Sequence, residues 1–481
     1  MDINKNANLS MLCDFYELTM GNGYFVQGMQ DRITYFDIFF RSVPDNGGYA
    51  IAAGLEQAIE YIQQLHFDED DIAYLRSRNM FDEGFLDYLR NFRFTGDIWA
   101  VPEGTPIFPR EPIMTVRAPA IQAQLVETFL LLTLNHQSLI ATKANRVVRA
   151  AKGRVVLEFG SRRAQGVDAA VDGARAAYIG GCKGTACTLT DQLYGVPAGG
   201  TMAHSWVQMF PSQYEAFKTY CEIYPDNPTL LVDTYNTLQS GIPDAIRAFN
   251  EVLKPKGLTK CGIRLDSGDM TYLTKKARQM LDDAGWESCT ISCSNALDEY
   301  LIRDLLLQGA RIDQFGVGER LITARSEPVF GGVYKLAAIE DENGNVIPTS
   351  KSSIASSETT PARRSQTIYA CLTRRSTTRR ISRSSTPRRR GSAKLSTTSR
   401  QKSSWSRFSK TASSSSSDRP SPRSRLTASS RSTRSGTRSS ALITRTPTML
   451  TSRRSSGRSS MTCCAKRSSD EAQEPRHGAL R

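Results

Sequence analysis

A short apolar segment followed by a polar loop and an amphipathic helix pattern occurs five times between residues 155 and 316. The apolar segments are 155–160, 230–233, 262–266, 290–294 and 312–316. After the first, their starts lie roughly 20 to 30 residues apart, the length of one strand and one helix in βαβ units. Because the segments do not alternate with polar residues, they are typical of parallel strands buried on both faces. The pattern predicts a parallel α/β barrel or a doubly wound sheet, in which ligands bind where strands end.

Residues 1–150 have a different pattern, which predicts a smaller α+β domain ahead of an α/β catalytic domain over 151–348. The expected elements are a helix over 9–25 ending in the Gly21-Asn22-Gly23 turn, a strand over 33–40, helices over 55–65 and 72–79, short strands within 98–116, and two core helices within 120–151. His136 lies in the last of these segments, and we interpret it as mainly structural.

The chain has a net charge of +14, and its excess of positive charge lies at one end. Residues 351–481 hold 30 of the 62 Lys and Arg but 5 of the 48 Asp and Glu, which leaves 32 basic and 43 acidic residues in 1–350. The acidic body argues against nucleic acid or a membrane surface as its partner. The ten cysteines lack zinc or disulfide spacing, and the first ten residues lack the apolar core of a secretory signal. We therefore expect reduced thiols and a cytoplasmic location. The most apolar helical segment, 125–134, is too short to span a bilayer.

Residues 349–481 do not have the composition of a folded domain. Between 351 and 481 there are 36 Ser and 25 Arg among 131 residues, too few apolar side chains to offset the loss of chain entropy on folding. We expect a disordered tail that results from a shift of reading frame, because codons for three of its segments can be chosen so that one common offset gives ordinary globular sequence. The alternative is an Arg/Ser-rich tail that binds RNA through phosphates, but this tail is irregular and nearly free of aromatic residues.

Charged residues and glycines follow the apolar segments, where a parallel sheet would gather its ligands. Arg162 and Arg163 follow Phe159, and two arginines at a strand end can bind a carboxylate or phosphate while the ring meets an aromatic substrate. An ion pair with a neighbouring acid is the structural alternative for one arginine. Gly316 and Gly318 leave backbone N–H groups accessible to a phosphate.

A further strand end reads Arg264-Leu265-Asp266-Ser267-Gly268-Asp269. Its two acids suit ribose hydroxyls or a hydrated Mg²⁺ that bridges phosphates. Asp269 is equally suited to cap the following helix.

His204 follows the Gly199-Gly200 turn and a small residue, so a bulky anion can approach its imidazole. A neutral imidazole nitrogen is nucleophilic near neutral pH, which makes His204 a candidate phosphate acceptor. A histidine tied into a packed loop is the alternative. The strand ends and His204 together indicate an aromatic acid and a phosphorylated sugar as ligands.

Six motifs in this order resemble those of the nicotinate phosphoribosyltransferase family, over residues 8 to 348. They are Asp14-Phe15-Tyr16-Glu17-Leu18-Thr19-Met20, Glu158-Phe159-Gly160-Ser161-Arg162-Arg163-Ala164-Gln165-Gly166, Gly200-Thr201-Met202-Ala203-His204-Ser205, Arg264-Leu265-Asp266-Ser267-Gly268-Asp269, Ser294-Asn295-Ala296-Leu297-Asp298-Glu299 and Phe315-Gly316-Val317-Gly318. The resemblance implies an irregular parallel α/β barrel and the conversion of nicotinate and phosphoribosyl pyrophosphate to nicotinate mononucleotide and pyrophosphate, in the salvage route to NAD. It also implies ATP hydrolysis, Mg²⁺ and a homodimer.

The resemblance assigns roles to individual residues. Phe159 would stack on the pyridine ring, and Tyr16 of a second subunit would cover the other face. Asp266 would act at the ribose and His204 would be transiently phosphorylated. The expected substrate-binding positions are Tyr16, Phe159, Arg162, Arg163, Thr185, Arg264, Asp269, Ser294, Asn295, Gly316 and Gly318. No residue is assigned as a metal ligand.

The substrate itself has alternatives, which are nicotinamide and quinolinate. In amide-using relatives an Asp follows the Gly-Thr pair that here is Gly184-Thr185. In this chain Ala186 follows instead, and because an Asp would repel the carboxylate of nicotinate, Ala186 favours nicotinate over the amide.

Overall fold

The computed structural model describes residues 8–349 and 406–409, which form two separate sheets and the helices packed on them. The predicted α/β class with a parallel sheet is confirmed. The helices are α1 (Phe15–Val26), α2 (Leu55–Gln64), α3 (Glu69–Ser77), α4 (Glu83–Arg90), α5 (Ala120–Gln124), α6 (Glu127–Ala150), α7 (Val167–Ile179), α8 (Thr188–Tyr194), α9 (His204–Gln208), α10 (Gln213–Ile223), α11 (Ile242–Ala248), α12 (Met270–Asp283), α13 (Glu299–Leu307) and α14 (Glu319–Ile322). Single turns of 3₁₀ or π helix lie at Pro44–Asn46, Ser161–Arg163, Thr237–Gly241, Phe249–Leu253 and Lys254–Lys256.

The first sheet is antiparallel and has the order β12-β11-β1-β5-β3-β13. Its strands are β1 (Ile33–Phe40), β3 (Asp97–Ala100), β5 (Met114–Pro119), β11 (Gly332–Glu340), β12 (Val346–Pro348) and β13 (Ser406–Ser409), and β2 (Ala50–Ile51) pairs separately with β4 (Pro106–Ile107). Strand β11 pairs with β1 along almost its whole length, from Thr34↔Ile339 to Phe40↔Gly332. Residues 332–348 thus lie in the sheet of the N-terminal segment, although the sequence analysis placed them with the catalytic domain.

The second sheet is parallel and has the order β6-β10-β9-β8-β7. Its strands are β6 (Val155–Glu158), β7 (Thr229–Leu231), β8 (Gly262–Leu265), β9 (Thr290–Cys293) and β10 (Gln314–Val317), each within the apolar segment predicted for it or shifted by one or two residues. Parallel bridges from Glu158 to Thr185 and from Thr185 to Ala198 extend the sheet beyond β6. Within 8–349 the order ends at β7 without pairing to this extension, so the described sheet is open.

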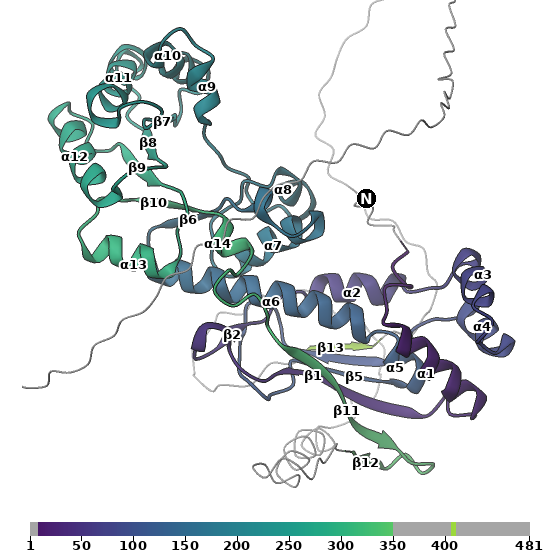
Figure 1. The fold of residues 1–481 in the computed structure, drawn as a ribbon. Coiled ribbons are helices and arrows are strands. Elements are labelled where there is room, and N and C mark those ends of the chain that lie inside the picture. Colours follow the sequence, from purple (N-terminus) through teal and green to yellow (C-terminus); the bar gives the residue numbers. More distant parts are fainter. Residues whose placement is uncertain (1–7, 350–405, 410–481) are drawn as a thin grey trace, which may run out of the picture. The chain divides into compact units, whose positions relative to one another are not determined.

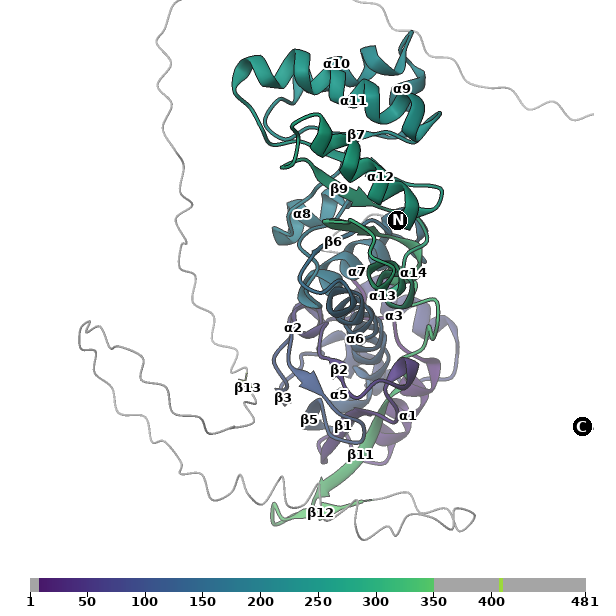
Figure 2. The same cartoon turned by 90° about the vertical axis from the view of Figure 1, so that its left-hand side faces the viewer.

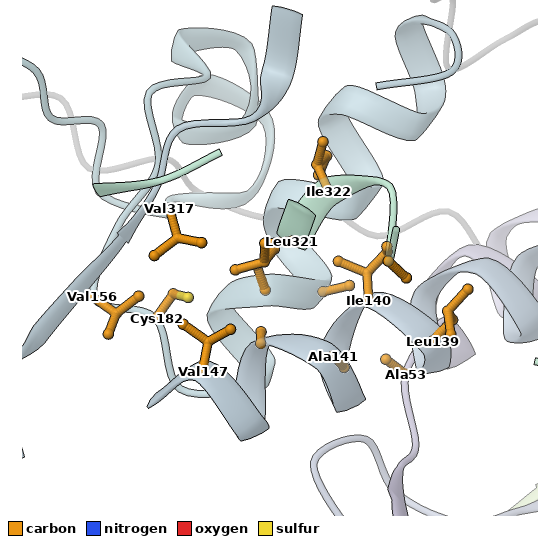
Figure 3. Close-up of a cluster of buried hydrophobic side chains, with 14 of the residues drawn as sticks. Ala53, Leu139, Ile140, Ala141, Val147, Val156, Cys182, Val317, Leu321 and Ile322 are labelled. Atoms are coloured by element: carbon orange, nitrogen blue, oxygen red, sulfur yellow. The ribbon is translucent and has the colours of Figure 1, made fainter. Parts of the chain in front are cut away.

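Helix α6 lies between the two sheets in both views (Figures 1 and 2) and contacts β11 of the first sheet and β6 of the second. The sequence predicted two helices here; most of the segment forms this one helix, preceded by the short α5. Val147 of α6 points with Val156 of β6 and Val317 of β10 into one apolar cluster around Cys182 (Figure 3), where all four residues are almost fully buried. This packing holds the parallel sheet on the long helix.

One predicted turn is wrong. Helix α1 runs through the Gly21-Asn22-Gly23 segment to Val26. A Cβ at Gly21 would lie 3.2 Å from the ring of Phe85, so Gly21 allows close packing against α4 and does not end the helix.

Four residues of the predicted tail are part of the first sheet, because β13 pairs antiparallel with β3. Thr349, the first residue of that tail, donates its N–H to Ala337 O at 2.8 Å. The rest of the predicted disordered, out-of-frame tail, 350–405 and 410–481, lies outside the described residues. No helix within the described ranges is both long and apolar enough to cross a bilayer.

Candidate active site

The carboxyl ends of the five parallel strands carry most of the residues predicted from the sequence. Phe159 follows β6, Asp266 follows β8, Ser294 follows β9, and Gly316 is the second-last residue of β10, which Gly318 follows. In a parallel sheet these ends form one edge, and the side chains and backbone contacts described below join them.

Arg264 is the centre of a hydrogen-bond network at this edge. Its Nε donates to Ser294 Oγ at 2.8 Å, and its Nη2 lies 3.1 Å from Asp266 Oδ1. Its Nη1 donates to Thr201 Oγ1 at 3.0 Å and to Met202 O at 3.3 Å. Arg264, predicted as a substrate-binding residue, therefore ties the loop that precedes His204 to Asp266 and Ser294.

Asp266 is held in its ionised form by this network. Ser294 Oγ donates to Asp266 Oδ1. Although burial acts in the opposite direction, the Ser294 hydroxyl and the Arg264 guanidinium lower the pKa of Asp266 below its ordinary value. A fixed negative charge at this edge can stabilise positive charge that develops on a bound sugar.

Two residues that the sequence analysis did not assign, Asp233 and Thr234, follow β7 and join His204 to Asp266. Thr234 Oγ1 lies 3.0 Å from His204 Nδ1. The neighbouring Asp233 accepts from the backbone N–H of Asp266 at 2.8 Å and from Ser267 Oγ at 2.7 Å. An acid directly after the buried segment 230–232 was the signal that could have identified this position, because Asp266 follows β8 in the same way.

Phe159 lies half-buried beneath Gly316 and Gly318. A Cβ at Gly316 would be 2.5 Å from Phe159 Cδ2, and one at Gly318 would be 3.0 Å from Phe159 O. The Arg264 guanidinium carbon is 5.9 Å from the centre of the Phe159 ring. Glycine at 316 therefore makes room for the Phe159 ring, and glycine at 318 makes room for the Phe159 backbone.

Glu158 is another residue that sequence reasoning did not assign. It is fully buried and accepts hydrogen bonds from the N–H of Gly160 and, at 2.7 Å, from Thr185 Oγ1. Burial raises the pKa of Glu158, although these two donors act against the rise. Glu158 fixes the Phe159 loop to Thr185, and Thr185 precedes the predicted selectivity residue Ala186.

The remaining predicted residues have more varied surroundings. Arg162 and Arg163 are exposed in the turn after Phe159. Asp269 is the N-cap of α12 and accepts from Tyr272 N at 3.0 Å, the structural role considered for it. Asn295 is exposed at φ 109°, a strained conformation of the kind found at functional sites.

Tyr16 lies on α1, which packs on α4 and α5 and not on the parallel sheet. Its side chain is 43% exposed. Burial of part of the ring and the nearby Glu127 raise the pKa of Tyr16 above its ordinary value. The structure of one chain therefore does not bring Tyr16 together with the residues at the strand ends.

Comparison with known proteins identifies the family. A nicotinate phosphoribosyltransferase of Bacillus subtilis is 46% identical to this chain over 361 residues, which cover 75% of this chain and 73% of that protein. The chain belongs to the nicotinate phosphoribosyltransferase family. Residues 11–135 match the model of the nicotinate phosphoribosyltransferase N-terminal domain.

Solved structures agree with this assignment. Human nicotinic acid phosphoribosyltransferase superposes with a TM-score of 0.61 at 29% identity, covering 68% of this chain and 74% of the human chain. Nicotinate-nucleotide pyrophosphorylase from Pyrococcus furiosus superposes with a TM-score of 0.56 at 25% identity, covering 73% and 87% of the two chains.

Proposed function

We propose that this chain transfers the phosphoribosyl group of phosphoribosyl pyrophosphate to nicotinate, forming nicotinate mononucleotide and pyrophosphate for NAD salvage. The observation that carries the proposal is the network of Arg264, Asp266, Ser294 and the His204 loop at the edge of the parallel sheet, next to Phe159. It places a flat ring, an ionised acid and a histidine together in a chain of this family.

The pyridine ring of nicotinate stacks on Phe159, and its carboxylate meets the exposed guanidinium of Arg162 or Arg163. As the bond from ribose C1′ to pyrophosphate breaks, positive charge develops on the ribosyl group, and the nearby carboxylate of Asp266 stabilises it. The pyridine nitrogen then forms the new bond to C1′. No proton has to be transferred, so the site needs fixed charges more than an acid and a base.

Mg²⁺ would enter with the phosphates. Asp233 Oδ1 is a buried oxygen without a hydrogen-bond partner in the described part of the chain, and with Asp266 it offers the oxygen ligands that Mg²⁺ prefers. The described residues contain no group of three or more His, Cys, Asp and Glu that could hold a metal by themselves. A magnesium ion bound to the leaving pyrophosphate would neutralise part of its charge.

His204 couples ATP hydrolysis to the transfer. Thr234 holds Nδ1, and Nε2 attacks the γ-phosphorus of ATP with release of ADP. Water later attacks the phosphorus of the phosphohistidine, breaks the P–N bond and releases phosphate. The coupling makes synthesis of the mononucleotide more favourable.

Ala186 sets the choice between acid and amide substrates. Its side chain is exposed, and its N–H donates to Glu158 O at 2.8 Å. Because no carboxylate stands at this position, the carboxylate of nicotinate is not repelled there. Nicotinamide and quinolinate are the competing substrates.

We also expect a cytoplasmic homodimer, in which the exposed Tyr16 of each copy covers Phe159 of the other, and a parallel sheet that is part of an irregular barrel. The tail over 349–481 is proposed to be an out-of-frame product. Any binding of RNA to this tail would be non-specific and would be lost at high salt.

The test is formation of nicotinate mononucleotide by the purified chain, with nicotinate, nicotinamide and quinolinate as separate substrates and with ATP present or absent. We expect product from nicotinate only, stimulated by ATP. His204→Asn is expected to remove the stimulation and the incorporation of label from γ-labelled ATP, whereas the matched control His66→Asn, an exposed histidine elsewhere, keeps both. Product from nicotinamide or quinolinate at equal rates would refute the proposed substrate. A frame-corrected chain is tested in parallel. Activity in that chain alone would show that the tail abolishes activity, whereas activity in neither chain would show that the assignment is wrong.

A further inference from the structure

A cavity of about 850 Å³ lies among α2, α6, α7 and α8, away from the strand-end site. Tyr61 of α2, Phe129 and His136 of α6, Asp172 of α7 and Tyr194 of α8 line it. None of the residues assigned to nicotinate or phosphoribosyl pyrophosphate contributes to its wall. A volume of this size is in the range of small-molecule sites.

An aromatic pair forms part of the cavity wall. The rings of Tyr61 and Phe129 are parallel within 7°, with centroids 3.8 Å apart. Leu12 and Leu132, at 41% and 54% exposure, add apolar surface at the cavity. The wall therefore suits a flat apolar body.

Two buried polar atoms on lining residues have no hydrogen-bond partner among the described residues, Tyr61 OH and His136 Nε2. Tyr61 is only 5% exposed. A buried hydroxyl without a partner is destabilising, so a bound group that hydrogen-bonds to Tyr61 OH would be favoured. Burial lowers the pKa of His136, which keeps its ring neutral and able to accept a hydrogen bond.

The charge of the cavity has one sign. The carboxylates of Glu60, Asp168 and Asp172 line it, and among the described residues no Lys or Arg does. The nearby Arg175 is already paired with Glu103 at 2.7 Å, and also with a second acid on α2. A cation would therefore meet uncompensated negative charge here.

Asp172 shows the effect of this charge on a single group. The pKa of Asp172 is raised to about 6, mainly by burial. The carboxylates of Asp168 and Glu60 also raise it, whereas the hydrogen bond from Tyr194 and the charge of Arg175 act in the opposite direction. The Tyr194 hydroxyl lies 3.2 Å from Asp172 Oδ1. A cation beside Asp172 would favour the ionised form and would be bound more tightly as the pH rises above 6.

We infer that this cavity is a second ligand site, which takes a small organic monocation with a flat apolar body, such as an aromatic amine. The ammonium group lies beside Asp172, the flat body packs on the wall formed by Tyr61 and Phe129, and a further polar group meets Tyr61 OH or His136 Nε2. Phosphorylated ligands are excluded because the three carboxylates repel them.

Titration calorimetry of the full chain with tryptamine tests the inference, with indole-3-propionate as the anion that carries the same ring. We expect tryptamine to bind and the anion not to bind. Asp172→Asn is expected to weaken tryptamine binding by about tenfold, the effect of losing roughly 1.4 kcal/mol of interaction. Tyr61→Phe, which keeps the ring and removes only the hydroxyl, should weaken it by a smaller factor. The control Asp304→Asn changes an acid that is 48% exposed and lies outside the cavity, and should bind as the parent does.

Equal binding of the anion and the cation would overturn the inference, and so would unchanged tryptamine affinity in a folded Asp172→Asn protein. Loss of tryptamine binding on self-association, followed by sedimentation at rising protein concentration, would show that a second copy fills the cavity and would also overturn it. The titration contains no nicotinate, phosphoribosyl pyrophosphate or ATP, so its outcome is independent of the proposed function.

Discussion

Replacement of Gly316 by alanine displaces the ring that is proposed to bind nicotinate. The added Cβ would lie 2.5 Å from Phe159 Cδ2 and 2.7 Å from Cε2, whereas ordinary contacts begin at 3.4 Å. The Phe159 ring must therefore move by about 1 Å, because the backbone fixes the position of the new Cβ, which Ser294 Cβ, at 3.3 Å, also crowds. Overpacking of this kind costs about 1–3 kcal/mol of stability, and a misplacement of about 1 Å at a site can cost about 100-fold in rate.

The assay is kcat and KM for nicotinate in both proteins, together with thermal unfolding. We expect kcat/KM for nicotinate to fall by at least about tenfold, with the larger part of the loss in KM because a stacking surface is lost. Gly48→Ala is the matched control, since no atom of the described residues lies within 4 Å of a Cβ there and its φ is not in the positive region. Unchanged kinetics in a folded Gly316→Ala protein would refute the assignment of Phe159 as the ring-binding residue.

Three further changes test other parts of the structure. Lys143 is 3% exposed and pairs with Glu299 at 2.7 Å. Lys143→Met leaves the acid buried without its partner and should lower the free energy of unfolding, measured by urea titration, by about 3–5 kcal/mol. The control Arg303→Ala breaks an exposed pair and should leave that free energy nearly unchanged. Burial raises the pKa of Glu17 from 4.5 to about 7. The protonated carboxyl therefore stabilises the folded chain at low pH, and this stability, up to about 3 kcal/mol, is lost as the pH rises from 4.5 to 7. Glu17→Gln should abolish the loss when the free energies of unfolding at pH 5 and pH 7.5 are compared. Ala186→Asp should reduce kcat/KM for nicotinate more than for nicotinamide, and an equal effect on both substrates would contradict its selectivity role.

The parallel strands could be predicted because each one is a local pattern. A short, mostly apolar segment of four to six residues before a polar loop identifies a strand buried on both faces, and β6 to β10 lie at or within two residues of the predicted positions. The first sheet could not be predicted in the same way, since β1 pairs with β11 about 300 residues later in the chain. Nothing in the sequence near either strand identifies its partner. The turn predicted at the glycines of α1 was wrong for a related reason, because Gly21 is needed for contact with Phe85, a residue distant in sequence.

The same distinction applies to the site. Residues directly after a buried strand, such as Asp266, are visible in the sequence because their position follows from the strand. Glu158 and Asp233 also occupy strand ends, but their importance depends on what they bind: Glu158 accepts from Thr185, and Asp233 accepts from the backbone of Asp266. Each thus joins loops that lie far apart in the chain, and a buried acid that joins two loops controls both at once. We therefore expect changes at Glu158 to affect ring stacking and substrate choice together, because the loop of Phe159 and the residue before Ala186 are held by the same carboxylate.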